Sequence, residues 1–306
     1  MSSRELIVLG SASQVPTRHR NHNAYFLRWD DEGILFDPGE GTQRQMTMAG
    51  LSASQVTRIC ITHFHGDHAL GLPGIIQRLS LDRATHAVEI YYPASGQAFF
   101  ERLRHATIFM DKATIVPRPI SGDGVLAETQ AWKLSAARLE HAVDTYGFRL
   151  EERSRVQLNP GRLAERGISG PLVGELQRKG AIVVDGRTIH LEEVGETRAG
   201  QSFAFVMDTR PCPNASVLAQ GVDLLVCEST YLDTERKEAH DHFHMTALQA
   251  AELARTANAR RLALTHFSQR YEDTGPFVAE AKPLLEDVVA VRDLDRVEVP
   301  KRSRSS

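Results

Sequence analysis

Short apolar runs alternate with amphipathic segments along the first half of the chain. The runs are bounded by Gly, Pro and Asp, as expected for strands that end in turns. The segments predicted to be extended are residues 5–10, the hairpin 24–41 turned at DDEG, residues 56–68 up to a loop, and 88–93. Residues 69–82 and 96–107 have helical spacing instead. Hairpins mixed with alternating strands and helices predict α/β layers rather than a purely parallel sheet.

The second half repeats this pattern, with a helix of good formers expected over 246–259. Four apolar strands each deliver a polar residue at the C-terminal end, namely His63, Asp208, Glu228 and His266. The carboxyl ends of strands are the usual place for the chemistry of α/β proteins. We therefore expect these side chains to meet in one site.

Residues 149–200 differ from the rest of the chain. They are rich in Gly and charge and poor in aromatic residues. We interpret them as a protruding arm inserted into a single domain that spans residues 1–306.

The composition excludes some classes of protein but does not indicate a function. With 306 residues, 42% hydrophobic and 25% charged, the chain is typical of a soluble globular protein. It has no apolar run of transmembrane length and no signal-peptide pattern at the N-terminus, so we expect a cytoplasmic protein without a membrane partner. A net charge of −3 gives no global attraction to nucleic acid, although a local basic patch can supply one. Three cysteines without a CxxC pair predict neither a disulfide scaffold nor a cysteine zinc site.

The sequence HFHGDH concentrates candidate metal ligands at the end of an apolar strand. In an extended chain, His63 and His65 point the same way, and Gly66 can turn Asp67 and His68 toward a second position. Imidazole and carboxylate ligands suit zinc, and also manganese or iron. Ordinary surface histidines are the alternative, but three histidines and one aspartate in six positions are rarely found that way.

HFHGDH has the HxHxDH form of the metallo-β-lactamase superfamily. The resemblance implies an αββα sandwich with a dinuclear metal site at its edge. It also implies three further ligands, a later histidine, a bridging aspartate and a final histidine. Carried over by position, the two metal ions would be held by His63, His65 and His141, and by Asp67, His68 and His266, with Asp208 bridging.

Several further segments resemble the ribonuclease Z family of tRNA 3′-processing endonucleases. They are GSASQVPTRHRN, LFDPGEGTQRQM, LEHAVDTYGFRL, DTRP and LTHFSQRY, spread over roughly residues 6–273. The resemblance implies a zinc-dependent endoribonuclease with two Zn²⁺ per chain, or Mn²⁺ or Fe²⁺ in their place. It would cleave the 3′ trailer of precursor tRNA after the discriminator base and leave a 3′-hydroxyl, with a metal-activated hydroxide as the nucleophile. Asp67 would assist that hydroxide, and a Glu228–His244 pair would protonate the leaving oxygen.

The same resemblance assigns substrate contacts. RGISGPLVGELQRKG resembles the Gly-Pro segment with which this family clamps tRNA, acting from the partner subunit of a homodimer. Basic groups on an arm suit phosphate contacts, although a solvated charged loop is the plain alternative. The predicted substrate-binding residues are Arg18, Arg20, Gly170, Pro171, Arg178 and Lys179.

Three positions depart from the family pattern. Cys227 stands where a histidine precedes the glutamate, Met207 stands where glycine precedes the bridging aspartate, and the arm reads ISGP rather than PPGP. A dinuclear-metal hydrolase of small phosphodiesters or sulfate esters on the same fold is therefore the first rival hypothesis. A metal-containing RNA-binding or assembly protein without turnover is the second.

Overall fold

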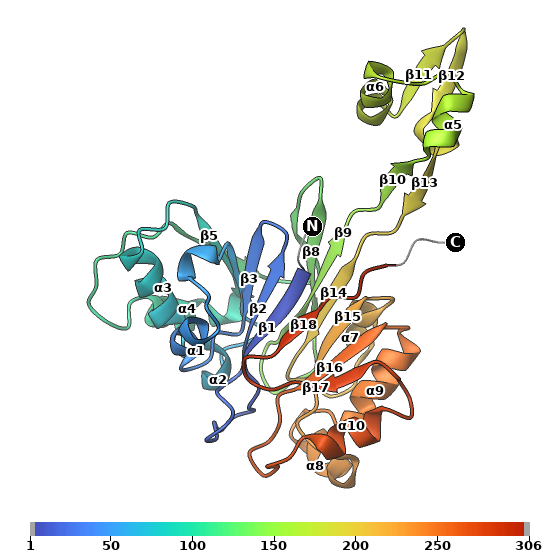
Figure 1. Cartoon of the computed structure of the whole chain (residues 1–306). Helices are drawn as coiled ribbons and strands as arrows, with labels where there is room; N and C mark the ends of the chain where they lie inside the picture. The colour runs from blue at the N-terminus through green and yellow to red at the C-terminus, as the bar shows by residue number, and fades with distance from the viewer. Residues whose placement is uncertain (1–3, 303–306) are drawn as a thin grey trace.

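The computed structural model describes residues 4–302, in which two seven-stranded sheets pack face to face (Figure 1). In spatial order the first sheet contains β18 (Arg296–Glu298), β1 (Arg4–Gly10), β2 (Ala24–Trp29), β3 (Glu32–Phe36), β4 (Arg58–Cys60), β5 (Val88–Pro93) and β6 (Ile115–Ile120). The second contains β17 (Val288–Ala290), β16 (Arg261–Thr265), β15 (Leu224–Glu228), β14 (Ser202–Val206), β9 (Tyr146–Glu152), β8 (Trp132–Arg138) and β7 (Gly124–Glu128). Both sheets mix parallel and antiparallel pairs, as the sequence predicted.

The space between the sheets is filled by alternate side chains of facing strands. The ring of Phe36 on β3 stacks on Phe205 of β14 at 4.8 Å and lies 5.5 Å from Phe203. Side chains on the opposite faces of the same strands pack under helices. Each sheet is thus buried on both faces, which explains why its strands read as nearly continuous apolar runs.

Helices cover the two outer faces of the sandwich. The first sheet carries α1 (Thr42–Met48), α2 (Gly66–Ala69), α3 (Leu72–Leu81) and α4 (Gln97–Arg104). The second carries α7 (Pro213–Ala219), α9 (Ala247–Thr256) and α10 (Gly275–Ala281), with α8 (Arg236–Asp241) nearby. This order of layers, visible in Figure 1, is the αββα sandwich predicted from the sequence, which is therefore confirmed.

The helix expected over 69–82 is divided in the structure. The short α2 begins inside the histidine cluster at Gly66, and α3 starts only after Gly71. A Cβ at Gly71 would lie 2.0 Å from the carbonyl oxygen of Gly39, so only glycine fits there, and the Gly71 amide donates to the Pro38 carbonyl instead of to a carbonyl within the helix. Helix α9 begins as predicted, with the Thr246 side chain accepting a hydrogen bond from the Gln249 amide.

The inserted segment forms an arm with a stalk and a head. The stalk pairs β10 (Arg155–Leu158) with β13 (Gly195–Arg198). The head contains α5 (Pro160–Glu165), α6 (Pro171–Lys179), β11 (Ala181–Val184) and β12 (Arg187–His190), around a small core of its own. Residues 149–152 of the predicted segment complete β9 of the sandwich instead. Figure 1 shows the head standing well away from the two sheets.

Four short 3₁₀ turns complete the secondary structure, at Ala53–Gln55, Ala94–Gly96, Leu191–Glu193 and Asp233–Glu235. Among residues 4–302, no helix is both long and apolar enough to span a bilayer.

Candidate metal centre

One edge of the sandwich gathers the seven predicted ligands from several loops. His63 and His65 follow β4, Asp67 and His68 lie in α2, and His141 lies between β8 and β9. Asp208 follows β14, and His266 follows β16. Because β4, β14 and β16 end at the same edge, residues far apart in sequence are brought within contact distance.

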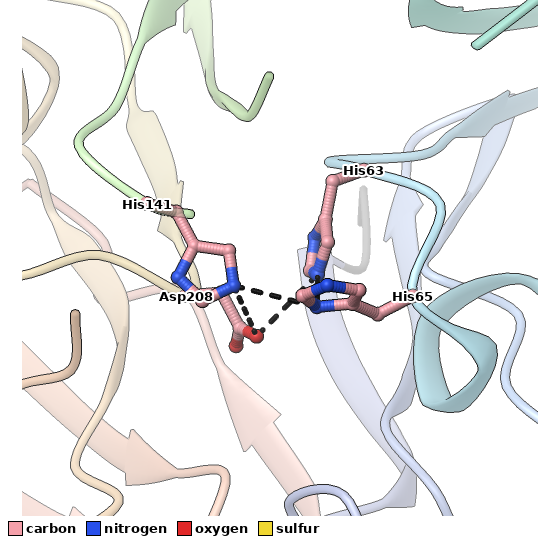
Figure 2. Close-up of side chains that lie close together, drawn as sticks. All are labelled: His63, His65, His141 and Asp208. Atoms are coloured by element: carbon pink, nitrogen blue, oxygen red, sulfur yellow. Dashed lines mark hydrogen bonds and ion pairs between the residues drawn. The ribbon is translucent and has the colours of Figure 1, made fainter. Parts of the chain in front are cut away.

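The first group contains His63, His65, His141 and Asp208, and is shown in Figure 2. Nδ1 of His65 lies 2.9 Å from Nε2 of His63 and 3.4 Å from Nε2 of His141. Oδ2 of Asp208 lies 3.5 Å from Nε2 of His63 and 3.7 Å from Nε2 of His141. One ligand atom from each residue lies within 4.8 Å of the others, a spacing that a single metal ion can bridge.

The second group contains Asp67, His68 and His266. Oδ2 of Asp67 lies 3.2 Å from Nε2 of His68 and 3.7 Å from Nε2 of His266. Asp208 also faces this group, with Oδ2 3.3 Å from Nε2 of His68 and Oδ1 3.0 Å from Nε2 of His266. The Asp208 carboxylate therefore lies between the two groups, the position expected of a bridging ligand.

Several buried nitrogen and oxygen atoms of this cluster have no hydrogen-bond partner and could instead bind a cation. Nε2 of His68, Nε2 of His266 and Oδ1 of Asp208 are buried without a hydrogen-bond partner among residues 4–302. Buried polar atoms left unpaired cost about 1–3 kcal/mol each. Three of them converging on one point, all of them types that bind zinc, fit a metal ion. The residues present therefore suit the group that the sequence implies.

The other nitrogen of four of these imidazoles is fixed by a partner outside the cluster. Nδ1 of His68 donates to Asp37 at 2.8 Å, and Nδ1 of His63 donates to Thr62 at 2.9 Å. Nδ1 of His266 lies 2.9 Å from the Thr230 hydroxyl, and Nδ1 of His141 lies 3.3 Å from the Phe243 carbonyl. A protonated Nδ1 leaves Nε2 as the ligand atom, the arrangement that supporting residues impose in metal sites.

The electrostatics of the cluster agree with cation binding. Burial, followed by its imidazole neighbours, holds the pKa of His63 well below the usual value, so His63 is neutral, as a ligand must be. Burial also opposes charge on His68, but Asp208, Asp67 and Asp37 override it and raise the pKa of His68 well above the usual value. The negative potential that holds a proton on His68 would equally hold a metal cation.

Several residues of the site have backbone conformations that residues other than glycine rarely adopt. The φ angles are +44° at Asp37, +45° at Asp208, +61° at Phe243 and +61° at His266. Such conformations cost of order 1–3 kcal/mol each and persist where surrounding structure imposes them, often at active sites. Here they turn the chain sharply at strand ends, which aims the side chains into the cluster.

Beside the metal ligands lies a fully buried carboxylate, that of Glu228. It accepts hydrogen bonds from the amides of Thr209 and Met245, at 2.5 and 3.1 Å, and from the Thr230 hydroxyl at 2.7 Å. Nδ1 of His244 lies 3.1 Å from both oxygens of Glu228. Burial lowers the pKa of His244, but the Glu228 carboxylate outweighs that effect and raises the pKa to about 9.

His244 also lies nearer to the metal ligands than its sequence position suggested. One of its nitrogens falls within 4.8 Å of ligand atoms of Asp208 and His266. His240 and His242, the neighbouring histidines in sequence, are exposed, and His242 bonds to the Tyr231 hydroxyl at 3.1 Å instead. Of these three histidines, the structure brings His244 to the cluster.

The cluster opens into a cleft of about 500 Å³. Its wall includes His65, His141 and His244 together with Tyr231, Phe243 and Arg270. The guanidinium of Arg270 binds Glu238 at 2.6 Å and lies over the Tyr231 ring. The cleft thus presents imidazoles, carboxylates and one arginine to a ligand.

The two predicted basic residues near the N-terminus behave differently from each other. Arg20 is only 8% exposed and donates to the carbonyl oxygens of Ser268 and Tyr271, so it holds its loop against the segment after His266. Arg18 is exposed and lines a hollow of about 850 Å³ next to the cleft. Arg18 is therefore accessible to a ligand, whereas the guanidinium of Arg20 is engaged by backbone carbonyls.

The predicted arm residues are exposed on the head and are not brought to the metal cluster of their own chain. Gly170 has a φ of +56° and precedes Pro171, the first residue of α6, which ends with Arg178 and Lys179. Lys179 pairs with Glu175 at 2.7 Å on the same helix. The two basic side chains thus form part of one exposed helical surface.

Two departures from the family pattern fall in apolar surroundings. Cys227 is fully buried among alanine and leucine side chains under α7 and α9. It precedes Glu228 on β15, so it faces away from the site. Met207 is fully buried between the sheets. Neither residue displaces a predicted ligand.

Several supporting residues were not identified from sequence, namely Asp37, Thr62, Thr230, Phe243 and Asn23, whose Nδ2 lies 3.0 Å from Nδ1 of His68. The signal for Asp37 was present, since it follows the apolar strand β3 just as His63 follows β4. The hydroxyl partners carried no comparable signal, because threonine at a strand end is common and its partner is set by the fold.

Comparisons with known proteins agree with this geometry. Residues 17–153 match the model of the metallo-beta-lactamase superfamily, and residues 193–267 match that of a beta-lactamase superfamily domain. The structure resembles the human short-form tRNase Z, with a TM-score of 0.70 and 24% identity over 97% of this chain and 100% of that one. Fold and metal cluster thus define a hydrolase of the metallo-β-lactamase class.

Sequence relatives narrow that class. Ribonuclease Z of Streptomyces avermitilis is 55% identical over 99% of this chain and 100% of the relative, and that of Streptomyces coelicolor is 56% identical over the same shares. The chain belongs to the ribonuclease Z family and is a metal-dependent endoribonuclease.

Proposed function

We propose that this chain removes the 3′ trailer of precursor tRNA by cutting after the discriminator base and leaving a 3′-hydroxyl. The observation that carries the proposal is the convergence of all seven predicted ligands at one sheet edge, in a chain that is more than half identical to ribonucleases Z along its length. The arm favours tRNA over small esters as the substrate, because a small ester bound at a metal centre is too short to contact a basic surface on the distant arm.

Two zinc ions per chain are the proposed cofactors, with manganese or iron as the alternatives. His63, His65 and His141 would hold one ion, Asp67, His68 and His266 the other, and Asp208 would bridge them. Such a pair supplies an activated water at neutral pH and neutralises charge on the reacting phosphodiester.

The protein's own groups then have separate tasks. Asp67, whose Oδ2 lies 3.2 Å from Nε2 of His68 and which lines the cleft, would orient the attacking water or accept its proton. His244 would give its proton to the leaving 3′ oxygen, because Glu228 both aligns the imidazole and favours its protonated form. Three further hydrogen-bonding groups hold Glu228 itself, so the pair is preorganised.

We further propose that the arm serves the active site of a partner subunit in a homodimer. The topology supports this, because β9 begins near His141 and ends at the stalk, while β14 begins at the stalk and ends near Asp208. The arm and the metal centre of one chain therefore lie at opposite ends of the same strands. Figure 1 shows the arm continuing from β9 and β14 away from the two sheets. Strand and stalk together span on the order of 35 Å.

Cleavage of a 5′-labelled precursor tRNA with a 3′ trailer tests the proposal. We expect purified protein with zinc or manganese to give one product that ends at the discriminator, and Asp67→Ala to give none. Hydrolysis of a small chromogenic phosphodiester without any precursor cleavage would instead establish the small-ester hydrolase. Tight tRNA binding with no turnover in any metal would establish the RNA-binding protein.

Subunit mixing tests the partner arrangement. A chain lacking the arm head and a chain carrying Asp67→Ala are each expected to be inactive on precursor tRNA. In a mixed dimer, the intact arm of the second chain can serve the intact centre of the first, so mixing should restore activity. Failure to restore activity in proven heterodimers would show that each arm serves its own chain.

A further inference from the structure

Two aromatic side chains that are not histidines, Tyr231 and Phe243, line the cleft together with His244. Tyr231 is only 7% exposed, and the Arg270 guanidinium covers its ring at 4.9 Å from the centroid. Phe243 is partly exposed to the cleft, and the Arg210 guanidinium lies 4.7 Å from its ring centroid. Of the two, Phe243 is the side chain that can present an aromatic surface to a ligand.

The backbone at Phe243 explains why a sharp turn is needed but not why phenylalanine occupies it. Its φ of +61° places the carbonyl oxygen 3.3 Å from Nδ1 of His141. Any residue would supply that carbonyl, and glycine would adopt this conformation with least strain. A bulky ring at a left-handed position is a strained choice. The aromatic ring of Phe243 must therefore have a role that is separate from forming the turn.

The surroundings of the ring keep it in a fixed position. Arg210 is tied to Glu140 by an ion pair, which holds the guanidinium over the ring. The ring of His141 stands nearly perpendicular to that of Phe243, at 87° and 6.3 Å between centroids. Phe243 is thus a preorganised aromatic surface beside a predicted metal ligand and next in sequence to His244.

We propose that Phe243, backed by Arg210, is a stacking platform for an unpaired base of the substrate. This rests on the proposed function, and it assigns the platform to the discriminator base, whose nucleotide carries the 3′ oxygen that leaves beside His244. Unpaired bases in RNA are commonly bound by stacking on aromatic rings and arginine planes. Such stacking tolerates any base, since every base has a π-face, and Arg210 adds attraction for the nearby phosphate.

Kinetics with modified precursors test the platform. We compare intact precursor tRNA with precursors that are abasic at the discriminator or at the first trailer nucleotide, using Phe243→Leu and Phe243→Tyr. Phe243→Leu should lower kcat/KM on the intact precursor by about 10-fold or more, whereas Phe243→Tyr, which keeps the ring, should retain it. On the precursor that is abasic at the discriminator, Phe243→Leu should cause no further loss.

Two controls separate stacking from structural damage. The bound metal content of Phe243→Leu should equal that of the parent protein, because the carbonyl that contacts His141 is retained. Phe99→Leu is the matched variant, since Phe99 is also exposed and also carries an arginine, Arg102, at 5.6 Å, but lies on α4 outside the cleft.

The outcomes distinguish this inference from the proposed function. If Phe243→Leu loses equal activity on intact and abasic precursors, or if it loses metal, the platform is wrong. Coupling to the first trailer nucleotide instead of the discriminator would overturn the assignment of the base. If the parent protein does not cleave precursor tRNA at all, it is the proposed function that has failed.

Discussion

The carboxylate of Asp37 lies 2.8 Å from Nδ1 of His68, and neither side chain is accessible to solvent. Asp37 also accepts hydrogen bonds from the Thr62 amide and hydroxyl, at 2.7 and 2.8 Å. Since Thr62 in turn contacts His63, one buried carboxylate orients a ligand in each of the two groups. Asp37 is a positioning residue for the whole centre.

Asp37→Asn should therefore weaken metal binding. The amide can still accept a hydrogen bond from Nδ1 of His68, but it loses the negative charge that makes the imidazole a better ligand. We expect a loss of about 10- to 100-fold in zinc affinity, measured by competition with a chelator. Asp31→Asn, at an exposed position in the β2–β3 turn, is the control. Equal affinities for the two variants would contradict the role of Asp37.

Thr230 connects the leaving-group pair to the metal centre. Its hydroxyl lies 2.7 Å from Oε2 of Glu228 and 2.9 Å from Nδ1 of His266. Thr230→Val keeps the shape but removes both hydrogen bonds, so we expect lower zinc affinity and lower kcat together. Thr230→Ser should restore both. A Thr230→Val protein with full zinc affinity would show that His266 needs no such partner.

His244→Ala should leave a metal-loaded protein that cleaves slowly. Loss of a general acid typically reduces the rate by 10²- to 10⁴-fold, and we expect that loss in single-turnover cleavage of precursor tRNA. The effect should vanish for a substrate whose leaving atom needs no proton, such as one with sulfur in place of the bridging 3′ oxygen, which leaves as a thiolate. His240→Ala and His242→Ala should have smaller effects. A larger loss in either would assign the acid to that histidine.

The arm head can be removed without disturbing the sandwich. Leu158 and Gly195 are paired at the outer end of the stalk, so a short glycine turn can join them in place of residues 159–194. We expect this protein to bind zinc and to hydrolyse a small phosphodiester, but to lose affinity for precursor tRNA. Unchanged tRNA affinity would mean that the arm is not a substrate-binding element.

Charge on α6 gives a finer test of the arm. If Arg178 contacts a phosphate, Arg178→Ala should weaken tRNA binding. It should also lower the slope of log Kd against log salt concentration by about one, since one fewer counterion is released on binding. Arg83→Ala, at an exposed position after α3, should not alter that slope. Equal slopes for the two variants would exclude a phosphate contact at Arg178.

Sequence alone predicted the part of this structure that is encoded locally. The strand ends at His63, Asp208, Glu228 and His266 were readable, because an apolar run followed by a polar residue is a local pattern. The pairing of His68 with Asp37, 31 residues away, was not, because only the fold brings the two together. The backbone contacts of Arg20 could not be read for the same reason, since its partners lie about 250 residues further along the chain.

The division of the predicted helix at 69–82 has a similar cause. Its apolar spacing is helical throughout, but the Gly71 amide donates to the carbonyl of Pro38, beside Gly39, instead of to a carbonyl within the helix. Local propensity could not reveal that contact, because Gly39 belongs to a different loop.

The ligands come from both halves of the sandwich, with His63 to His68 beside the first sheet and Asp208 and His266 beside the second. A bound metal pair would therefore crosslink the two sheets, and separating the sheets would require breaking metal–ligand bonds. Metal at a thousand times its dissociation constant would add about 4 kcal/mol to the free energy of unfolding. The supply of metal would then determine the lifetime of the folded protein as well as its activity.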